Sequence, residues 1–329
     1  MPKISLVHIF PVIAILIVGA FPSLLSAQEI EYLPKGGLSI KYDFRTTTID
    51  SVYSGADQRS MLESELKEQS LKNDEVNGSL YYQTHTQLFR LQYGLSETLN
   101  LSLKIPYINR QRHSDLEVSD SSDTDQGSFA ENHDNTKTDG FGDLTLGLIW
   151  RPVYNDIVDF RISGELNGDN GATHYTNPDK LSLGNGAYDV GLTMRILIYS
   201  LESRMMTDIE LNSTSTLDTT VEEDSDSFQY SKASDAFLKI DLSNNTARWH
   251  YGLGLKALVG GESIIDGTQQ EDSYIAYQYR VFLNTGNLDA LEESTQALPW
   301  MAGVLIENTF FGANAPGANT IGLKAVLYF

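Results

Sequence analysis

The last nine residues, 321–329, read IGLKAVLYF and decide the fold class. Apolar side chains stand at every second position from Ile321 to Phe329, and Gly322 and Lys324 lie between them. Successive side chains of a β-strand point to opposite faces. This pattern therefore predicts a strand with one apolar face and one polar face.

The same alternation, with a period of two residues, recurs through the chain after residue 37. Ten more stretches show it, and residues 80–93 indicate a further strand whose mixed pattern does not separate its two faces. Together these stretches predict about 12 antiparallel strands, an even number, as single-chain bacterial barrels have. The ten stretches are residues 38–44, 99–107, 144–150, 160–162, 190–198, 209–211, 238–242, 249–255, 275–281 and 300–306.

The lengths of the connections favour a membrane barrel over a soluble β-sandwich, whose strands would also alternate. Short turns are expected near residues 96–97, 154–156, 201–203 and 244–246. Long polar stretches lie between them, at residues 51–77, 118–140, 169–186, 219–234 and 262–273. Barrels with short periplasmic turns and long extracellular loops have this rhythm, and only residues 284–297 are long where a short turn is expected.

Aromatic residues support the same interpretation. Tyr328 and Phe329 end the last strand and resemble the insertion signal of outer-membrane proteins. Trp150, Trp249 and Trp300 lie near predicted strand ends, where an apolar ring with a polar edge suits the membrane interface. The predicted fold class is all-β: a transmembrane antiparallel up-and-down β-barrel of about 12 strands.

The charged face of these strands must look inward. A Lys or Arg that faces lipid at the bilayer midplane costs ~2–4 kcal/mol, and eight basic residues share the polar face. Turning that face outward would cost more than a typical net stability of ~5–15 kcal/mol. The lumen is thus predicted to be polar and mixed in sign, with Asp208 and Asp241 among its acids. The lumen-facing candidates are Lys41, Asp43, Arg45, Lys104, Asp143, Arg161, Glu165, Asp189, Arg195, Glu210, Lys239, Lys256, Arg280, Glu307 and Lys324.

The N-terminus has the three parts of a secretory signal peptide. Lys3 provides a positive start, residues 9–21 are mostly apolar, and Ser26 and Ala27 offer small residues for cleavage. Residues 1–27 are therefore predicted to be a cleaved signal peptide. Residues 28–329 are predicted to form the barrel, with long acidic extracellular loops, in the outer membrane of a Gram-negative bacterial cell.

The composition limits the partners. The 329 residues include 44 acidic and 23 basic side chains, a formal net charge of −21, and no cysteine. Such acidity argues against a nucleic-acid partner, which needs basic residues on the protein, and the lack of Cys excludes disulfides and thiolate metal sites. The expected partners are outer-membrane lipid, lipopolysaccharide, the barrel-assembly machinery and a small-molecule solute.

No sequence motif for catalysis or a cofactor is present, so no enzyme activity, cofactor or metal is predicted. His174, Asp179 and Ser182 lie close together in one long polar stretch, which keeps an outer-membrane hydrolase as a minor alternative. The acidic runs at residues 120–125 and 222–226 could hold divalent cations. They lack the spacing of a calcium loop, and a solvated surface loop is the simpler interpretation.

Two motifs in the middle of the chain resemble a known family. Residues 91–111 read LQYGLSETLNLSLKIPYINRQ, and residues 139–152 read DGFGDLTLGLIWRP. They are similar to the "YGL…PY" hairpin and the "GxGDLTLG" strand of the outer-membrane transporter family of the MetA-pathway of phenol degradation, whose barrels are FadL-like or porin-like. The resemblance implies a barrel that takes up hydrophobic or aromatic compounds, and it supplies no catalytic residues.

Three functions remain open from the sequence. The first is an outer-membrane channel or transporter for small solutes, which the resemblance extends to hydrophobic or aromatic ones. The second is a structural or surface-interaction barrel that passes no solute. The third is the hydrolase. Solute flux separates the first from the second, and the loss of activity on changing one loop Ser or His would identify the third.

Overall fold

The computed structural model describes most of the chain after residue 31. The described residues are 32–53, 59–62, 76–115, 117–118, 135–169, 181, 183–184, 187–200, 203–217, 219–223, 226–232, 234–246, 248–265, 268–269, 273–287 and 298–329. The predicted signal peptide and the candidate loop residues His174, Asp179 and Ser182 lie outside them. The acidic run at 120–125 lies outside them too.

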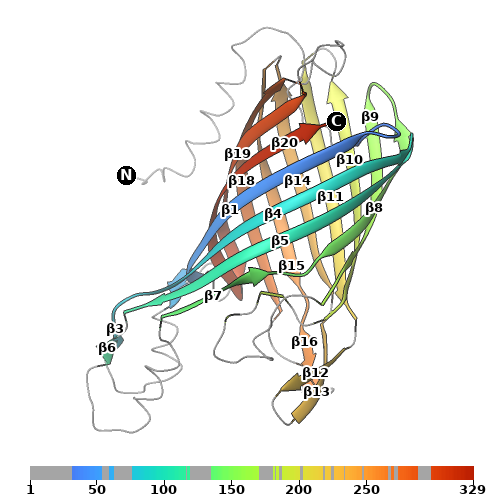
Figure 1. The fold of residues 1–329 in the computed structure, drawn as a ribbon. Coiled ribbons are helices and arrows are strands. Elements are labelled where there is room, and N and C mark those ends of the chain that lie inside the picture. The colour runs from blue at the N-terminus through green and yellow to red at the C-terminus, as the bar shows by residue number, and fades with distance from the viewer. Residues whose placement is uncertain are drawn as a thin grey trace, which may run out of the picture.

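Twelve antiparallel strands form a closed barrel (Figure 1). Each strand pairs with the next along the chain, and the first strand pairs with both the second and the last, which closes the ring. The predicted fold class and the predicted count of about 12 strands are confirmed. The strands are β1 (Leu38–Tyr53), β4 (Leu80–Ser96), β5 (Leu99–Ser114), β8 (Thr145–Tyr154), β9 (Val158–Asn167), β10 (Asp189–Ser200), β11 (Met205–Thr216), β14 (Asp235–Asn245), β15 (Trp249–Gly260), β18 (Tyr274–Asn287), β19 (Trp300–Ala313) and β20 (Ala315–Tyr328).

The barrel has two different ends. One end, called the short-turn end, holds the start of β1, the end of β20 and the tight turns after β4, β8, β10 and β14. In the turn after β8, the Asn155 side-chain oxygen accepts hydrogen bonds from the amides of Ile157 and Val158, both at 2.9 Å. The opposite, long-loop end carries the other long connections, whereas the one between β18 and β19 joins Asn287 and Trp300 at the short-turn end, as the sequence indicated. The long-loop end also has one tight turn that the sequence did not indicate, at Asn314, where φ is 51°.

Short strands lie beyond the barrel at the long-loop end (Figure 1). One of them, β7 (Thr136–Phe141), continues the line of β8, because both strands pair with β5 at successive positions. The others form small sheets of their own or extend β1. They are β2 (Arg59–Met61), β3 (Val76–Asn77), β6 (Glu117–Val118), β12 (Thr219–Glu223), β13 (Asp226–Lys232), β16 (Ser263–Ile265) and β17 (Thr268–Gln269).

The outer surface of the barrel is apolar. Leu148, Leu192 and Leu323 are about half exposed, and many other strand residues of their face are similar. All three tryptophans of the sequence lie at the short-turn end and are 40% to 50% exposed. Soluble proteins rarely expose an apolar area of this extent, whereas a bilayer covers it. The outward face therefore suits lipid, with tryptophan at one interface.

No helix among the described residues is long and apolar enough to cross a membrane.

The faces of β4, which the sequence left unassigned, follow from its register. Leu91 lies opposite Ile40, and Phe89 lies opposite Tyr42. Directly opposite residues of an antiparallel pair share a face, so Phe89 and Leu91 face outward with the apolar side chains of β1. Arg90, between them, faces the lumen.

Candidate functional site in the barrel lumen

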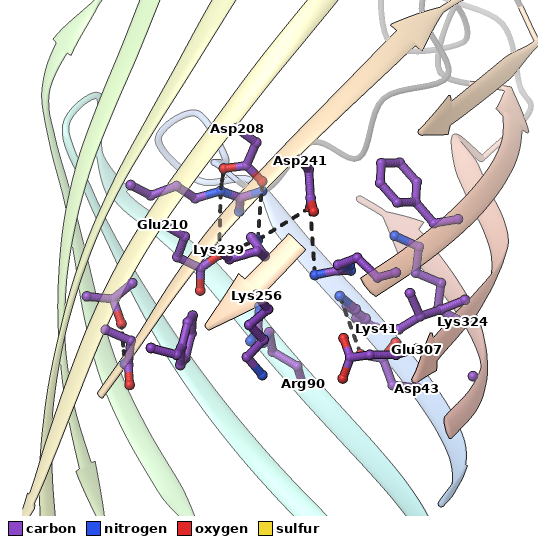
Figure 2. Close-up of a pocket in the computed structure, with 18 of the residues that line it drawn as sticks. Lys41, Asp43, Arg90, Asp208, Glu210, Lys239, Asp241, Lys256, Glu307 and Lys324 are labelled. Carbon is purple, nitrogen blue, oxygen red and sulfur yellow. Dashed lines mark hydrogen bonds and ion pairs between the residues drawn. The ribbon is translucent and has the colours of Figure 1, made fainter. Parts of the chain in front are cut away.

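The barrel interior contains a cavity of about 540 Å³ with a strongly charged lining (Figure 2). Thirteen of the fifteen residues that the sequence placed in the lumen line it. They come from β1, β5, β9, β10, β11, β14, β15, β18, β19 and β20, so nearly the whole wall contributes. The basic lining residues are Lys41, Arg45, Arg90, Lys104, Arg161, Arg195, Lys239, Lys256, Arg280 and Lys324, and the acidic ones are Asp43, Glu165, Asp208, Glu210, Asp241 and Glu307.

Two lumen candidates lie away from this cavity. Asp189 begins β10 at the long-loop end, where its carboxylate accepts hydrogen bonds from the Thr216 hydroxyl (2.7 Å) and the Asn167 amide (3.5 Å). Asp143 lies between β7 and β8, and its carboxylate lies against Gly184. Arg151, on β8, pairs with Asp159 at 2.8 Å.

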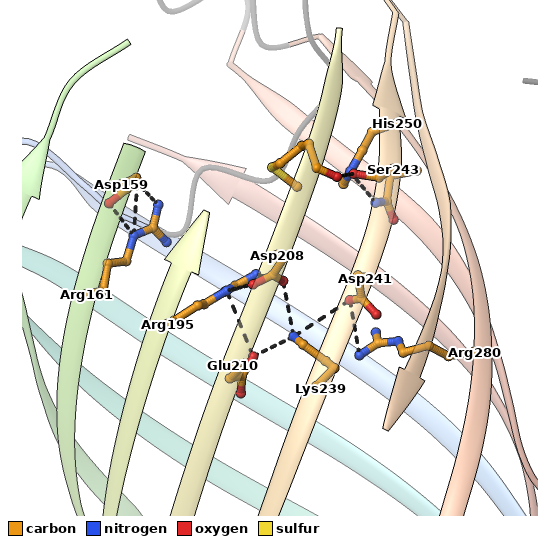
Figure 3. Close-up of polar contacts among 12 residues, drawn as sticks. Asp159, Arg161, Arg195, Asp208, Glu210, Lys239, Asp241, Ser243, His250 and Arg280 are labelled. Carbon is orange, nitrogen blue, oxygen red and sulfur yellow. Dashed lines mark hydrogen bonds and ion pairs between the residues drawn. The ribbon is translucent and has the colours of Figure 1, made fainter. Parts of the chain in front are cut away.

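An extended set of ion pairs holds one side of the lumen (Figure 3). Its centre is Lys239, whose ammonium lies 2.5 Å from Glu210, 3.2 Å from Asp208 and 3.8 Å from Asp241. Arg195 donates two hydrogen bonds to Asp208, at 2.8 and 2.7 Å. We call this set the ion-pair cluster; its members are Arg195, Asp208, Glu210, Lys239, Asp241 and Arg280.

The strand register creates this cluster. Arg195, Glu210 and Lys239 lie directly opposite one another across β10, β11 and β14, so the sign of the charge alternates from strand to strand. The three basic and three acidic members balance one another. Asp208 and Asp241 are buried, so their charges depend on these partners and not on bulk water. The cluster therefore has no net charge, and its ion pairs connect the four strands β10, β11, β14 and β18.

Smaller ion pairs continue around the wall. Lys104 on β5 donates to both carboxylate oxygens of Glu165 on β9, at 2.7 and 2.5 Å, across the intervening β8. On β1, Lys41 lies 3.3 Å from Asp43. Nearer the short-turn end, Arg161 binds the fully buried Asp159. The lumen charges are thus mostly compensated within the wall.

The wall formed by β1, β4 and β5 is different because it is mainly basic. Lys41, Arg90 and Lys104 lie directly opposite one another on the three adjacent strands. Like charges in such positions repel. Lys41 and Lys104 have acidic partners, whereas Arg90 makes no hydrogen bond or ion pair with any described residue, and its buried Nε is unsatisfied. Arg90 is the charged lining residue that the sequence analysis missed.

A short segment before β1 occupies the lumen at the short-turn end. Leu33 packs against Met301, Val326 and Tyr328, all buried and all on the inward face. In the amide orientation that satisfies its neighbours, Asn100 accepts a hydrogen bond from the Leu33 amide (2.7 Å) and donates one to the Leu33 carbonyl (3.0 Å). This segment narrows the lumen between the charged cavity and the short-turn end.

Comparisons with known proteins support the fold. No protein-family model matches the chain, and no curated protein matches its sequence. The fold is similar to that of an outer membrane channel from Pseudomonas putida F1, with 19% identity and a TM-score of 0.67, over 92% of this chain and 99% of that chain. At this identity the likeness shows the fold alone. The sequence resemblance to the MetA-pathway family stays a prediction.

Two autotransporter domains give weaker matches. The transport unit of AIDA-I from Escherichia coli is 9% identical with a TM-score of 0.46, over 97% of both chains. The translocator domain of NalP from Neisseria meningitidis is 9% identical with a TM-score of 0.45, over 91% of both chains. With TM-scores below 0.5, neither match bears on function.

Proposed function

We propose that this protein is a channel of the bacterial outer membrane through which small solutes pass. The observation that carries the proposal is a closed barrel with an apolar outer surface around a polar cavity of about 540 Å³. A cavity of that size matches the volume of ordinary small-molecule sites. The similar fold of the P. putida outer membrane channel is consistent with it.

The solute proposed is hydrophobic or aromatic. Two observations support this class. The motifs at residues 91–111 and 139–152 resemble a family that takes up such compounds. Apolar side chains also line the cavity among the charges, including Phe237, Phe282 and Leu305. An aromatic solute would meet both ring faces and polar groups on its way through the lumen.

The orientation follows the usual rule for such barrels. Residues 1–27 would be removed as a signal peptide, and the barrel-assembly machinery would insert residues 28–329. The long-loop end would face outward, where its acidic loops would meet lipopolysaccharide, and the short-turn end would face the periplasm. The tryptophans at the short-turn end would then mark the periplasmic interface.

A barrel that passes no solute is the second candidate, and one observation favours it. Leu33 and its neighbours fill part of the lumen at the short-turn end and are buried there. If this segment stays in place, the barrel is closed at that end. The same contact in a channel would act as a constriction that limits flux.

The test is conductance of the refolded protein in a planar lipid bilayer. We expect reproducible steps in the wild type, and larger or longer steps in Leu33→Gly, because this change removes the buried side chain that anchors the segment. Lys35→Gln is the matched control, since Lys35 lies on the same segment but is exposed. A silent bilayer with both the wild type and Leu33→Gly, each correctly folded, would refute a channel.

A further inference from the structure

The cavity has a charge opposite to that of the chain as a whole. The chain carries a formal net charge of −21, yet the cavity is lined by ten basic and six acidic side chains, an excess of four positive charges. A solute inside the barrel therefore meets a positive surface. Because low-dielectric walls focus the field of lining charges, this excess acts strongly on an anion in the lumen.

One of these four charges, that of Arg161, is balanced by the buried Asp159, which is not part of the lining. The remaining excess is concentrated in three side chains. Arg45, Arg90 and Lys256 make no hydrogen bond or ion pair with other residues in the described part of the chain. Lys256 lies 4.7 Å from the ring centroid of Phe237, and Glu307 and Glu210 lie within electrostatic range of it. Every other basic lining residue has a partner among the described residues.

These three side chains line the same cavity. Arg45 lies on the inward face of β1, four residues after Lys41. Lys41 is directly opposite Arg90. Lys256 comes from β15 on another part of the wall, and it lies within electrostatic range of Arg45. Figure 2 shows Arg90 and Lys256 reaching into the pocket. Like charges so arranged repel one another, and a bound anion would relieve that repulsion.

We propose that Arg45, Arg90 and Lys256 form a binding site for the carboxylate of a small aromatic anion. A guanidinium presents paired donors that match the two oxygens of a carboxylate, and the unsatisfied Arg90 Nε provides one such donor. Phe237 beside Lys256, together with Phe282 elsewhere in the lining, offers apolar surface for the ring. This inference names the solute class of the proposed channel and rests on it for access to the cavity.

The experiment measures binding by titration calorimetry on the full barrel in uncharged detergent at low salt. Benzoate is the probe, and benzamide is the neutral control of nearly the same shape. The variants are Arg90→Gln and Lys256→Gln, with Lys137→Gln as a matched loss of one charge on exposed β7, outside the cavity. Arg90→Lys keeps the charge but removes the paired donors. Retarded migration of the unheated barrel on an SDS gel checks that each variant folds.

We expect saturable benzoate binding to the wild type, with an affinity that falls at least tenfold in Arg90→Gln and in Lys256→Gln. Arg90→Lys should fall between the wild type and Arg90→Gln, and Lys137→Gln should bind as the wild type does. Benzamide should bind at least tenfold more weakly than benzoate. Equal binding of the two probes, or equal benzoate binding by wild type and both glutamine variants, would overturn the site. A folded wild type that binds no benzoate would overturn it as well.

Conductance separates this inference from the proposed function. Binding in detergent does not require passage of a solute. A barrel that conducts but prefers benzamide or neither probe keeps the channel and loses the anion site. A barrel that binds benzoate through Arg90 and Lys256 but never conducts keeps the site and loses the channel.

Discussion

Replacing Lys239 by Met should destabilise the barrel more than any other single change of a lumen charge. Lys239 lies within ion-pair distance of three carboxylates, those of Asp208, Glu210 and Asp241. Methionine keeps most of the volume but removes the charge, so the neutral ion-pair cluster acquires a net charge of −1. Removing one partner of a buried pair costs about 3–5 kcal/mol. Glu210 retains some contact with water, so we expect about 3 kcal/mol.

The free energy of unfolding is measured by guanidinium titration of the barrel in lipid vesicles, followed by tryptophan fluorescence. Lys239→Arg, which keeps the charge, should lose less than about half of the Met effect, and Lys137→Met on exposed β7 should lose almost nothing. The double change Lys239→Met with Glu210→Gln restores neutrality and should recover part of the loss. If Lys239→Met unfolds within about 0.5 kcal/mol of wild type, the cluster does not brace the wall.

Three further changes test other parts of the structure. Met194→Arg places a charge on the outward face at the middle of β10 and should cost ~2–4 kcal/mol in the same titration. Gly94→Val should release the segment before β1, because a Cβ at Gly94 would overlap the Pro34 carbonyl, and protease cleavage near residue 34 should become faster. The Ser79 amide and hydroxyl donate to Asp115 and hold the pKa of this carboxyl below its usual value. The folded pKa is the lower one, so this contact stabilises the hairpin above the usual pKa and is lost as pH falls through the folded pKa. The protection of the Ser79 amide against hydrogen exchange, taken relative to its intrinsic exchange rate at the same pH, should therefore fall at low pH in the wild type, and Asp115→Asn should lack this pH dependence.

Each of the three has an outcome that contradicts its reasoning. Met194→Arg with wild-type stability would mean that position 194 does not face lipid. Unchanged cleavage in Gly94→Val, compared with Gly164→Ala, where a Cβ meets no atom within 4 Å, would mean that the close approach of Gly94 to Pro34 does not hold the segment. A wild-type pH dependence that survives in Asp115→Asn would assign it to another group.

The sequence located the barrel strands because lipid outside and water inside impose the period of two. Leu144, Leu146, Leu148 and Trp150 all face outward as expected. The pattern failed in β4 for a physical reason. His85 and Gln87 are polar, yet they lie on the outward face with Phe89. Their side chains are hydrogen-bonded to Thr46 (3.0 Å) and Tyr42 (3.2 Å) of β1, and this allows polar residues at positions where the pattern would require apolar ones. Without a clear phase, Arg90 could not be placed.

The ion-pair partners within the lumen could not be predicted from the sequence either. Alternation shows that Arg195 faces inward, but it does not give the strand register. Arg195 lies directly opposite Glu210, yet its guanidinium donates its hydrogen bonds to Asp208, two residues earlier on β11. The sequence also did not predict the tight turn at Asn314. A single Asn with left-handed backbone in a short hairpin is a weak sequence signal beside the long polar loops.

The closing seam of the barrel has a consequence for how the chain acquires its structure. β1 pairs with β20 as well as with β4, and Thr47 and Thr320, hydrogen-bonded at 2.8 Å, are 273 residues apart. Every other adjacent pair of barrel strands joins neighbours in the chain, so eleven seams can form locally while the twelfth must wait. Until it forms, one edge of β1 and one edge of β20 offer unpaired backbone groups to any passing strand. During folding, closure of the barrel therefore competes with strand pairing between molecules, and dilution should favour closure.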